Sequence, residues 1–262
     1  MKIETLIKEI NKKQIWDEKP VFCFTSDVDW ASEDVMKEYF KAVIPMDIKP
    51  TLFVTHDSKV IQDNYKAGNI ERGIHPNFLP GSSHGDSYLE VIKNCAEYAP
   101  ETYGFRSHRA FEVTDTSHLM KNNFGFKYVS HQITIFQTHI KPILVESGLI
   151  NFPVFFEDGT HLYNKLSLFI EKYLFLFKTP GIKIISFHPM NFVLNSPTLD
   201  YMRDIKDILT RSEYNNINTK LIGLLINQNT GIRNTTLDII NFVKENNYPI
   251  YSMNELYNLI VE

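Results

Sequence analysis

Short apolar segments alternate with longer helical patterns along most of this 262-residue chain. The apolar segments predict β-strands at 21–25, 51–55, 70–74, 102–105, 126–130, 150–156, 182–187 and 249–251. Helical patterns occur at 31–44, 86–98, 117–124, 162–177, 199–209, 235–246 and 253–261. This alternation is typical of an α/β protein with a parallel sheet covered by helices on its outer side. Because seven or eight such units fit into 262 residues, the pattern favours a barrel over an open sheet.

Composition, charge and the pattern of apolar segments exclude several classes of protein. No repeat or linker interrupts the pattern, which predicts one domain over residues 1–262 with a core at about 20–255. A net charge of −4 without any basic run argues against nucleic acid as a partner. Residues 1–13 are amphipathic and lack the apolar region of a signal peptide, and the apolar stretch 166–177 is too short to span a membrane. We therefore expect a cytoplasmic protein.

Polar side chains with acid–base or metal-binding chemistry follow the predicted strands at the point where each strand ends. They are Asp27, Asp29, His56, His75, Arg106, His108, His131, Asp158 and His188. The carboxyl ends of the strands in a parallel barrel meet at one face, which is where active sites form. A single histidine there is usually structural, whereas several histidines beside two aspartates indicate a site.

The segment Ser26-Asp27-Val28-Asp29-Trp30 is the sharpest local signal. Alternation along a strand places Asp27 and Asp29 on the same face. Two carboxylates so close together repel each other unless a cation or a shared proton relieves the repulsion. The alternative is a turn that caps the next helix, but Glu33 and Asp34 are better placed for capping.

A second signal is the loop after His75, in which proline, glycine and serine lead to His84. Pro76 holds His75 in an extended conformation, and the loop can return His84 toward it. One aspartate and two histidines form a three-ligand set with open positions, which suits a divalent ion that activates water. The alternative is a plain loop with two exposed histidines. His188, followed by Pro189, is a candidate general acid or base on the same face.

These motifs resemble the polysaccharide deacetylases of the NodB-homology superfamily (carbohydrate esterase family four), and particularly the WbmS-type branch of O-antigen gene clusters. The resemblance extends from about residue 21 to 252. It implies a distorted (β/α)7 barrel in which a divalent metal ion, with Zn²⁺ as the first choice, acts in catalysis. The implied ligands are Asp29, His75 and His84, and the implied catalytic residues are Asp27 as base, Arg106 as the residue that orients it, and His188 as acid.

The chain departs from the family pattern at four places. One residue separates the two acids of the first motif, and His75 and His84 are nine residues apart instead of four. Ser107-His108 stands where the family has a proline-containing turn. The family's Asp-Trp motif is not recognisable, and Glu157-Asp158-Gly159 is its nearest equivalent.

The resemblance further implies hydrolysis of the acetamido group of a sugar used in surface-polysaccharide biosynthesis. The acetylated sugar would be nucleotide-linked, lipid-linked or part of a polysaccharide. The residues predicted to bind it are Trp30, Asn77, Arg109, His131 and Asp158. Two alternatives stay open: a metal-dependent glycosyltransferase, in which the two aspartates grip a cation and a sugar diphosphate, and a carbohydrate-binding protein that has lost catalysis.

Overall fold

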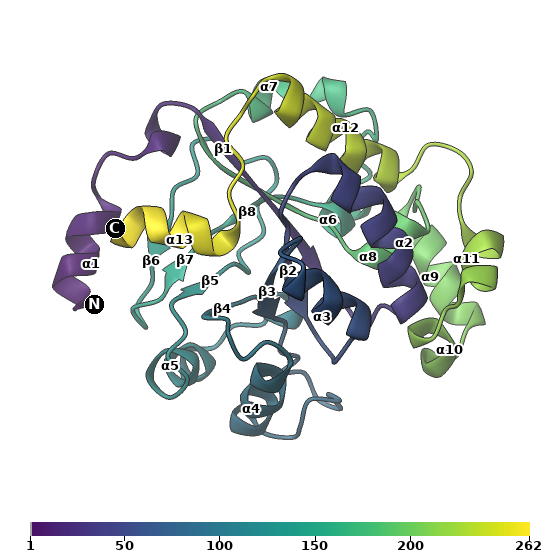
Figure 1. Cartoon of the computed structure of the whole chain (residues 1–262), viewed down its shortest axis with the longest axis horizontal. Coiled ribbons are helices and arrows are strands. Elements are labelled where there is room, and N and C mark those ends of the chain that lie inside the picture. Colours follow the sequence, from purple (N-terminus) through teal and green to yellow (C-terminus); the bar gives the residue numbers. More distant parts are fainter. Residues whose placement is uncertain (1) are drawn as a thin grey trace.

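The computed structural model describes residues 2–262 and contains a nine-stranded sheet (Figure 1). The strands are β1 (Pro20–Asp27), β2 (Thr51–Val54), β3 (Glu71–Ile74), β4 (Gly104–Phe105), β5 (Tyr128–Val129), β6 (Ile143–Leu144), β7 (Ile150–Asn151), β8 (Val154–Glu157) and β9 (Gly181–Ser186). Their order in the sheet is β6-β7-β5-β4-β3-β2-β1-β9-β8. Neighbouring strands are parallel except for β6 and β7.

The chain that follows β5 brings the two ends of the sheet together. Val154 of β8 donates its N–H to the carbonyl of Gln132 at 2.8 Å, and Phe136 donates to the carbonyl of Phe155 at 3.0 Å. The residues after β5 thus run beside β8, which lies at the opposite end of the strand order. This closure confirms the predicted α/β barrel, in an irregular form.

Helices cover the outside of the sheet (Figure 1). They are α1 (Ile3–Ile10), α2 (Glu33–Val43), α3 (Lys59–Lys66), α4 (Tyr88–Tyr98), α5 (Thr114–Asn122), α6 (Asp158–Tyr163), α7 (Leu174–Phe177), α8 (Pro189–Val193), α9 (Leu199–Ile208), α10 (Arg211–Asn215), α11 (Thr219–Leu225), α12 (Ile232–Glu245) and α13 (Met253–Val261). All eight residues of β1 are buried, as expected for a strand with helices outside and packed side chains inside.

The predicted elements and the structure differ at several places, among them the predicted strand at 150–156, which is divided into β7 and β8. The predicted strand at 249–251 is wrong, since only a single bridge joins Ile250 to Phe22. The predicted helix at 162–177 is interrupted: α6 ends at Tyr163 and Lys165 has a positive φ of 52°, a left-handed conformation that a helix cannot contain. Helices α1 and α3 were not predicted, although Ser58 caps α3 by accepting a hydrogen bond from the N–H of Ile61 at 3.2 Å.

Candidate active site

The candidate active site lies at the carboxyl ends of β1, β3, β4 and β9. Directly after β1, Asp29 and Trp30 both have positive φ angles, of 46° and 56°. Such backbone is uncommon outside glycine, and consecutive cases concentrate at functional sites. A hydrogen bond of 2.9 Å from the Trp30 N–H to Thr55 Oγ1 holds this turn. The turn directs the Asp29 carboxylate toward histidines from two other strand ends.

Asp29, His75 and His108 bring three donor atoms together. Asp29 Oδ1 lies 3.2 Å from His75 Nε2 and 3.1 Å from His108 Nδ1, and the two nitrogens are 3.4 Å apart. A tetrahedral ion with bonds of about 2.0–2.1 Å would require neighbouring donors to lie about 3.3–3.4 Å apart. The three atoms are therefore spaced as one face of such a tetrahedron, and a divalent ion fits this set of residues.

The charge state of Asp29 also suits a metal ligand. Burial acts to raise the pKa of Asp29, but hydrogen bonds with His108 and His75 outweigh it and hold the pKa well below its usual range. The group therefore stays ionised at any pH at which the histidines are neutral. An ionised carboxylate and two neutral imidazoles are the forms that bind a divalent ion.

Asp27 is held by a different partner. Arg106 donates from one guanidinium nitrogen to Asp27 Oδ1 at 2.8 Å, to Thr25 Oγ1 at 3.0 Å and to Ser186 Oγ at 2.7 Å. Burial acts to raise the pKa of Asp27, but the positive charge of Arg106 outweighs it, and the pKa lies below its usual value. Among residues 2–262, side-chain hydrogen bonds to Asp27 use only Oδ1, which leaves Oδ2 for a water molecule.

His188 follows β9 and is oriented by the first residue of α6. Its Nδ1 lies 2.6 Å from Asp158 Oδ1, and its backbone N–H donates to Asp158 Oδ2 at 2.9 Å. Burial acts to lower the pKa of His188, but the negative charge of Asp158 and the hydrogen bond to it raise it well above its ordinary value. Burial and Asp158 also raise the pKa of the neighbouring Glu157. His188 is thus held as a proton carrier, with Nε2 3.6 Å from Asp29 Oδ2.

The structure does not bring His84 into the metal-binding group. His84 Nε2 lies 2.7 Å from the carbonyl oxygen of Thr55, and the N–H of Asn77 donates to its Nδ1 at 3.0 Å. Both ring nitrogens are therefore used by the backbone. The indole of Trp30 packs against both imidazoles, with its ring centroid 5.4 Å from that of His84 and 5.3 Å from that of His108. The structure thus places His108, and not the predicted His84, beside Asp29 and His75.

His108 was not predicted to belong to this group, although its position carried a signal. It comes three residues after Phe105 at the end of β4, which is the position that the strand-end pattern marks. The predicted set relied on the proximity of His75 and His84 along one loop. The structure instead combines residues from β1, β3 and β4, so that strand-end position was a better guide than separation along the chain.

The residues predicted to bind substrate fall into two groups. Trp30 lines a cavity of about 450 Å³ over Asp29, and Arg109 and His131 line an adjoining cavity of about 510 Å³. His131 is paired there with Glu112, with 2.9 Å between Nε2 and Oε2. Two predictions do not fit. Asn77 is absent from the lining of both cavities, and Asp158 is fully buried beneath His188.

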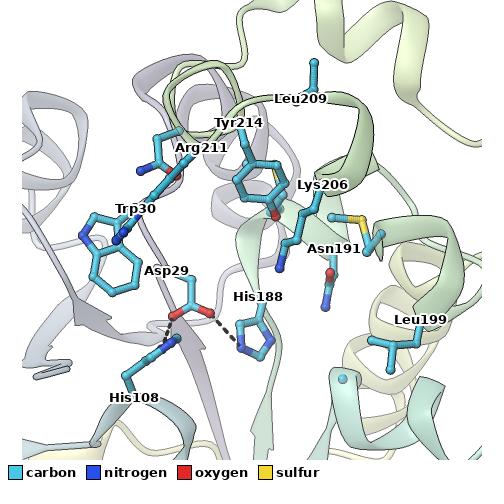
Figure 2. A pocket seen from close by; sticks show the side chains of 14 residues that line it. Asp29, Trp30, His108, His188, Asn191, Leu199, Lys206, Leu209, Arg211 and Tyr214 are labelled. Carbon is cyan, nitrogen blue, oxygen red and sulfur yellow. Dashed lines mark hydrogen bonds and ion pairs between the residues drawn. The ribbon is translucent and has the colours of Figure 1, made fainter. Parts of the chain in front are cut away.

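Figure 2 shows how the first cavity is built. Asp29, His108 and His188 form its floor, with the carboxylate of Asp29 directed toward both histidines. Lys206 and Arg211 extend from the chain above toward that floor.

Across residues 2–262, no helix combines the length and apolar character needed to cross a membrane.

Comparisons with known proteins identify the family and the fold. The family of WbmS-like polysaccharide deacetylases matches residues 24–206. No curated protein matches the chain. A crystal structure of WbmS from Bordetella bronchiseptica, provisionally assigned as a polysaccharide deacetylase involved in O-antigen biosynthesis, superposes with a TM-score of 0.73. It is 20% identical, over 85% of this chain and 90% of that one.

Two peptidoglycan deacetylases are more distant, each 10% identical. A peptidoglycan N-acetylglucosamine deacetylase has a TM-score of 0.49 over 90% of this chain and 92% of its own. PdaC from Bacillus subtilis has a TM-score of 0.46 over 92% of both. The likeness to WbmS confirms the predicted distorted (β/α)7 barrel of the NodB-homology type. Since the family match covers well over half of the sequence, the chain belongs to the WbmS-like polysaccharide deacetylases.

Proposed function

We propose that this protein is a metal-dependent deacetylase that hydrolyses the N-acetyl group of a sugar used in O-antigen or related surface-polysaccharide biosynthesis. The observation that carries the proposal is the Asp27–Arg106 pair beside the group of Asp29, His75 and His108. Family membership supports the reaction type, and the assignment of WbmS supports the biosynthetic context. We assign Asp29, His75 and His108 as the metal ligands and Zn²⁺ as the preferred ion. We further propose that the protein acts in the cytoplasm.

When bound, the ion would polarise the acyl carbonyl and lower the pKa of a water molecule. The residues of the chain supply the proton transfers. Asp27 accepts a proton from the water molecule while the oxygen of that water adds to the acyl carbon. Arg106 keeps Asp27 ionised and oriented. The C–N bond then breaks, and His188 gives its Nε2 proton to the departing amine. The products are acetate and a free amino sugar.

We assign Asp158 as a positioning residue for His188. Its two oxygens bind the Nδ1 and the backbone N–H of His188, so that the proton to be donated is carried on Nε2. A buried carboxylate beside an imidazole also stabilises the imidazolium form. This arrangement explains why Asp158 is placed under the histidine and away from the substrate.

The glycosyltransferase alternative fits the geometry less well. It needs both Asp27 and Asp29 as ligands of one cation that also binds a sugar diphosphate. Asp27 Oδ1 is instead paired with Arg106, and the donor atoms nearest Asp29 are histidine nitrogens. Imidazole nitrogens are more typical of Zn²⁺ than of the cations that bind diphosphates.

Acetate release tests the proposal. The purified protein, stripped with a chelator and reloaded with Zn²⁺, is incubated with N-acetylglucosamine and with UDP-N-acetylglucosamine. We expect acetate from wild type, none from the stripped protein, and a rate at least about 100-fold lower for Asp27→Asn, because general-base catalysis contributes 10²–10⁴-fold. The exposed Asp115→Asn serves as the matched control. Equal release by wild type and Asp27→Asn would contradict catalysis by this site and favour the carbohydrate-binding alternative.

A further inference from the structure

A segment that lies over the candidate active site carries two cations that have no acidic partner. The segment comprises residues 199–215, with α9 and α10, and we refer to it as the cover segment. Lys206 and Arg211 line the cavity over Asp29 and extend toward its floor (Figure 2). Among residues 2–262 neither forms an ion pair, whereas Arg203, one turn before Lys206, pairs with Asp200 at 3.1 Å.

Hydrogen bonds link the cover segment to the body of the protein through α11. Tyr201 donates its hydroxyl to the carbonyl of Leu225. Farther along, Thr219 donates both its backbone N–H and its hydroxyl to Asp34 Oδ2, each at 3.0 Å. Asp34 belongs to the first turn of α2, the helix that follows Asp29. The cover segment is therefore tied to α11, and α11 in turn to the helix that follows Asp29.

The charges around the two cavities are divided between floor and rim. The acidic residues that line them are Asp27, Asp29 and Glu157, of which the first two belong to the groups described above and Glu157 accepts hydrogen bonds from the first turn of α6. Lys206 borders both cavities, Arg211 borders the first and the exposed Arg109 borders the second. The side chains that face the cavities from the rim therefore carry positive charge, while Asp204, Asp207 and Glu213 of the cover segment lie outside both linings. A group of cations that faces a cavity attracts anionic ligands.

From this division of charge we propose that the substrate is an anionic acetamido sugar, whose phosphate or carboxylate group is bound by Lys206 and Arg211 while its acetamido group lies on the floor. The inference rests on the proposed deacetylase function and names its substrate class. A cavity of about 450 Å³ is within the size range of sites for small molecules, and it holds both ends of such a ligand. Lys206 is the specificity-determining residue, since it lies where the two cavities meet.

The test compares four acetylated sugars on the Zn²⁺-loaded protein. N-acetylglucosamine is neutral, N-acetylglucosamine 1-phosphate and UDP-N-acetylglucosamine carry phosphate, and N-acetylglucosaminuronic acid carries a carboxylate. We expect kcat/KM for at least one anionic sugar to exceed that for the neutral sugar by about tenfold or more, which is the usual scale of a hydrogen bond to a charged group. The anion that shows the larger preference identifies the source of the charge.

Substitution of the cations tests the assignment to these residues. Lys206→Met and Arg211→Met should each lower the anionic-to-neutral ratio of kcat/KM by roughly tenfold. Lys220→Met, an exposed lysine on α11 outside both cavities, should leave the ratio as in wild type. A wild-type ratio near one, or a ratio that Lys206→Met and Arg211→Met do not change, overturns the proposal while the deacetylase function stands.

A binding measurement separates this inference from the failure of the proposed function. Calorimetry with the three anionic sugars on Zn²⁺-loaded Asp27→Asn protein, with and without Lys206→Met, needs no catalysis. If no sugar releases acetate but one anionic sugar binds about tenfold more weakly after Lys206→Met, the anion site stands and the deacetylase function fails. If no anionic sugar binds or reacts, the anion site is refuted.

Discussion

Replacement of His108 and of His84 by alanine gives opposite predictions for metal binding and for stability. His108 supplies one of three donor atoms that lie 3.1–3.4 Å apart. His84 instead joins two backbone segments, through the carbonyl of Thr55 and the N–H of Asn77. His108→Ala should therefore remove metal affinity, and His84→Ala should reduce the stability of the fold.

The size of both effects follows from these contacts. Zn²⁺ sites with four ligands bind with about 10–16 kcal/mol, or about 2.5–4 kcal/mol per ligand if the ligands share the energy equally. His108→Ala should thus weaken Zn²⁺ binding roughly 100- to 1,000-fold. His84→Ala leaves two buried backbone groups unpaired at about 1–3 kcal/mol each, so the metal-free protein should lose about 2–6 kcal/mol of unfolding free energy.

Two measurements decide the comparison. Zn²⁺ affinity is obtained by competition with a chromophoric chelator, and the stability of the metal-free protein by urea unfolding. His118→Ala is the control, because His118 is exposed and its partner is the exposed Glu146. If His84→Ala loses the metal and His108→Ala keeps it, the assignment of ligands from the donor-atom distances is wrong.

Three further substitutions test other parts of the structure. Asp158→Asn should let His188 lose its proton at lower pH, so that the alkaline limb of the pH–kcat profile moves to lower pH; an unmoved limb contradicts the pairing. Arg106→Ala should lower the free energy of unfolding by about 3–5 kcal/mol, because it leaves the carboxylate of Asp27 buried and unpaired; a wild-type Tm in thermal unfolding would refute this. Gly104→Ala should cost about 1–3 kcal/mol in urea unfolding, since its Cβ would lie 2.0 Å from the Tyr128 ring.

The repeating strands and helices were largely predictable because burial controls them. Strands such as 21–25 and 182–187 are apolar on both faces, and the structure places them side by side as β1 and β9. The exceptions depend on features that an apolar pattern does not contain. The aromatic stretch 162–177 is apolar enough for one helix, but the left-handed backbone at Lys165 divides it. The apolar residues at 249–251 meet β1 at only one bridge.

The candidate site was predictable to the level of strand ends and no further. The face on which Asp29, His75 and His188 meet follows from the direction of the strands alone. The choice between His84 and His108 depends on the path of a loop and on the Trp30 indole, which contacts both rings. The burial of Asp158 follows from its place at the first residue of α6, directly after a strand, where it faces His188.

The hydrogen bonds of Arg106 have a consequence for how the protein folds. This side chain joins β4 to Thr25 of β1 and Ser186 of β9, which are 81 and 80 residues away along the chain. Strands β1 and β9, which pair with each other, are separated by about twice that distance. Contacts between such distant segments form late, because the entropy of closing long loops must be overcome first. The groups that move protons thus come together only when the barrel closes, and we expect refolding to restore activity in its slowest phase.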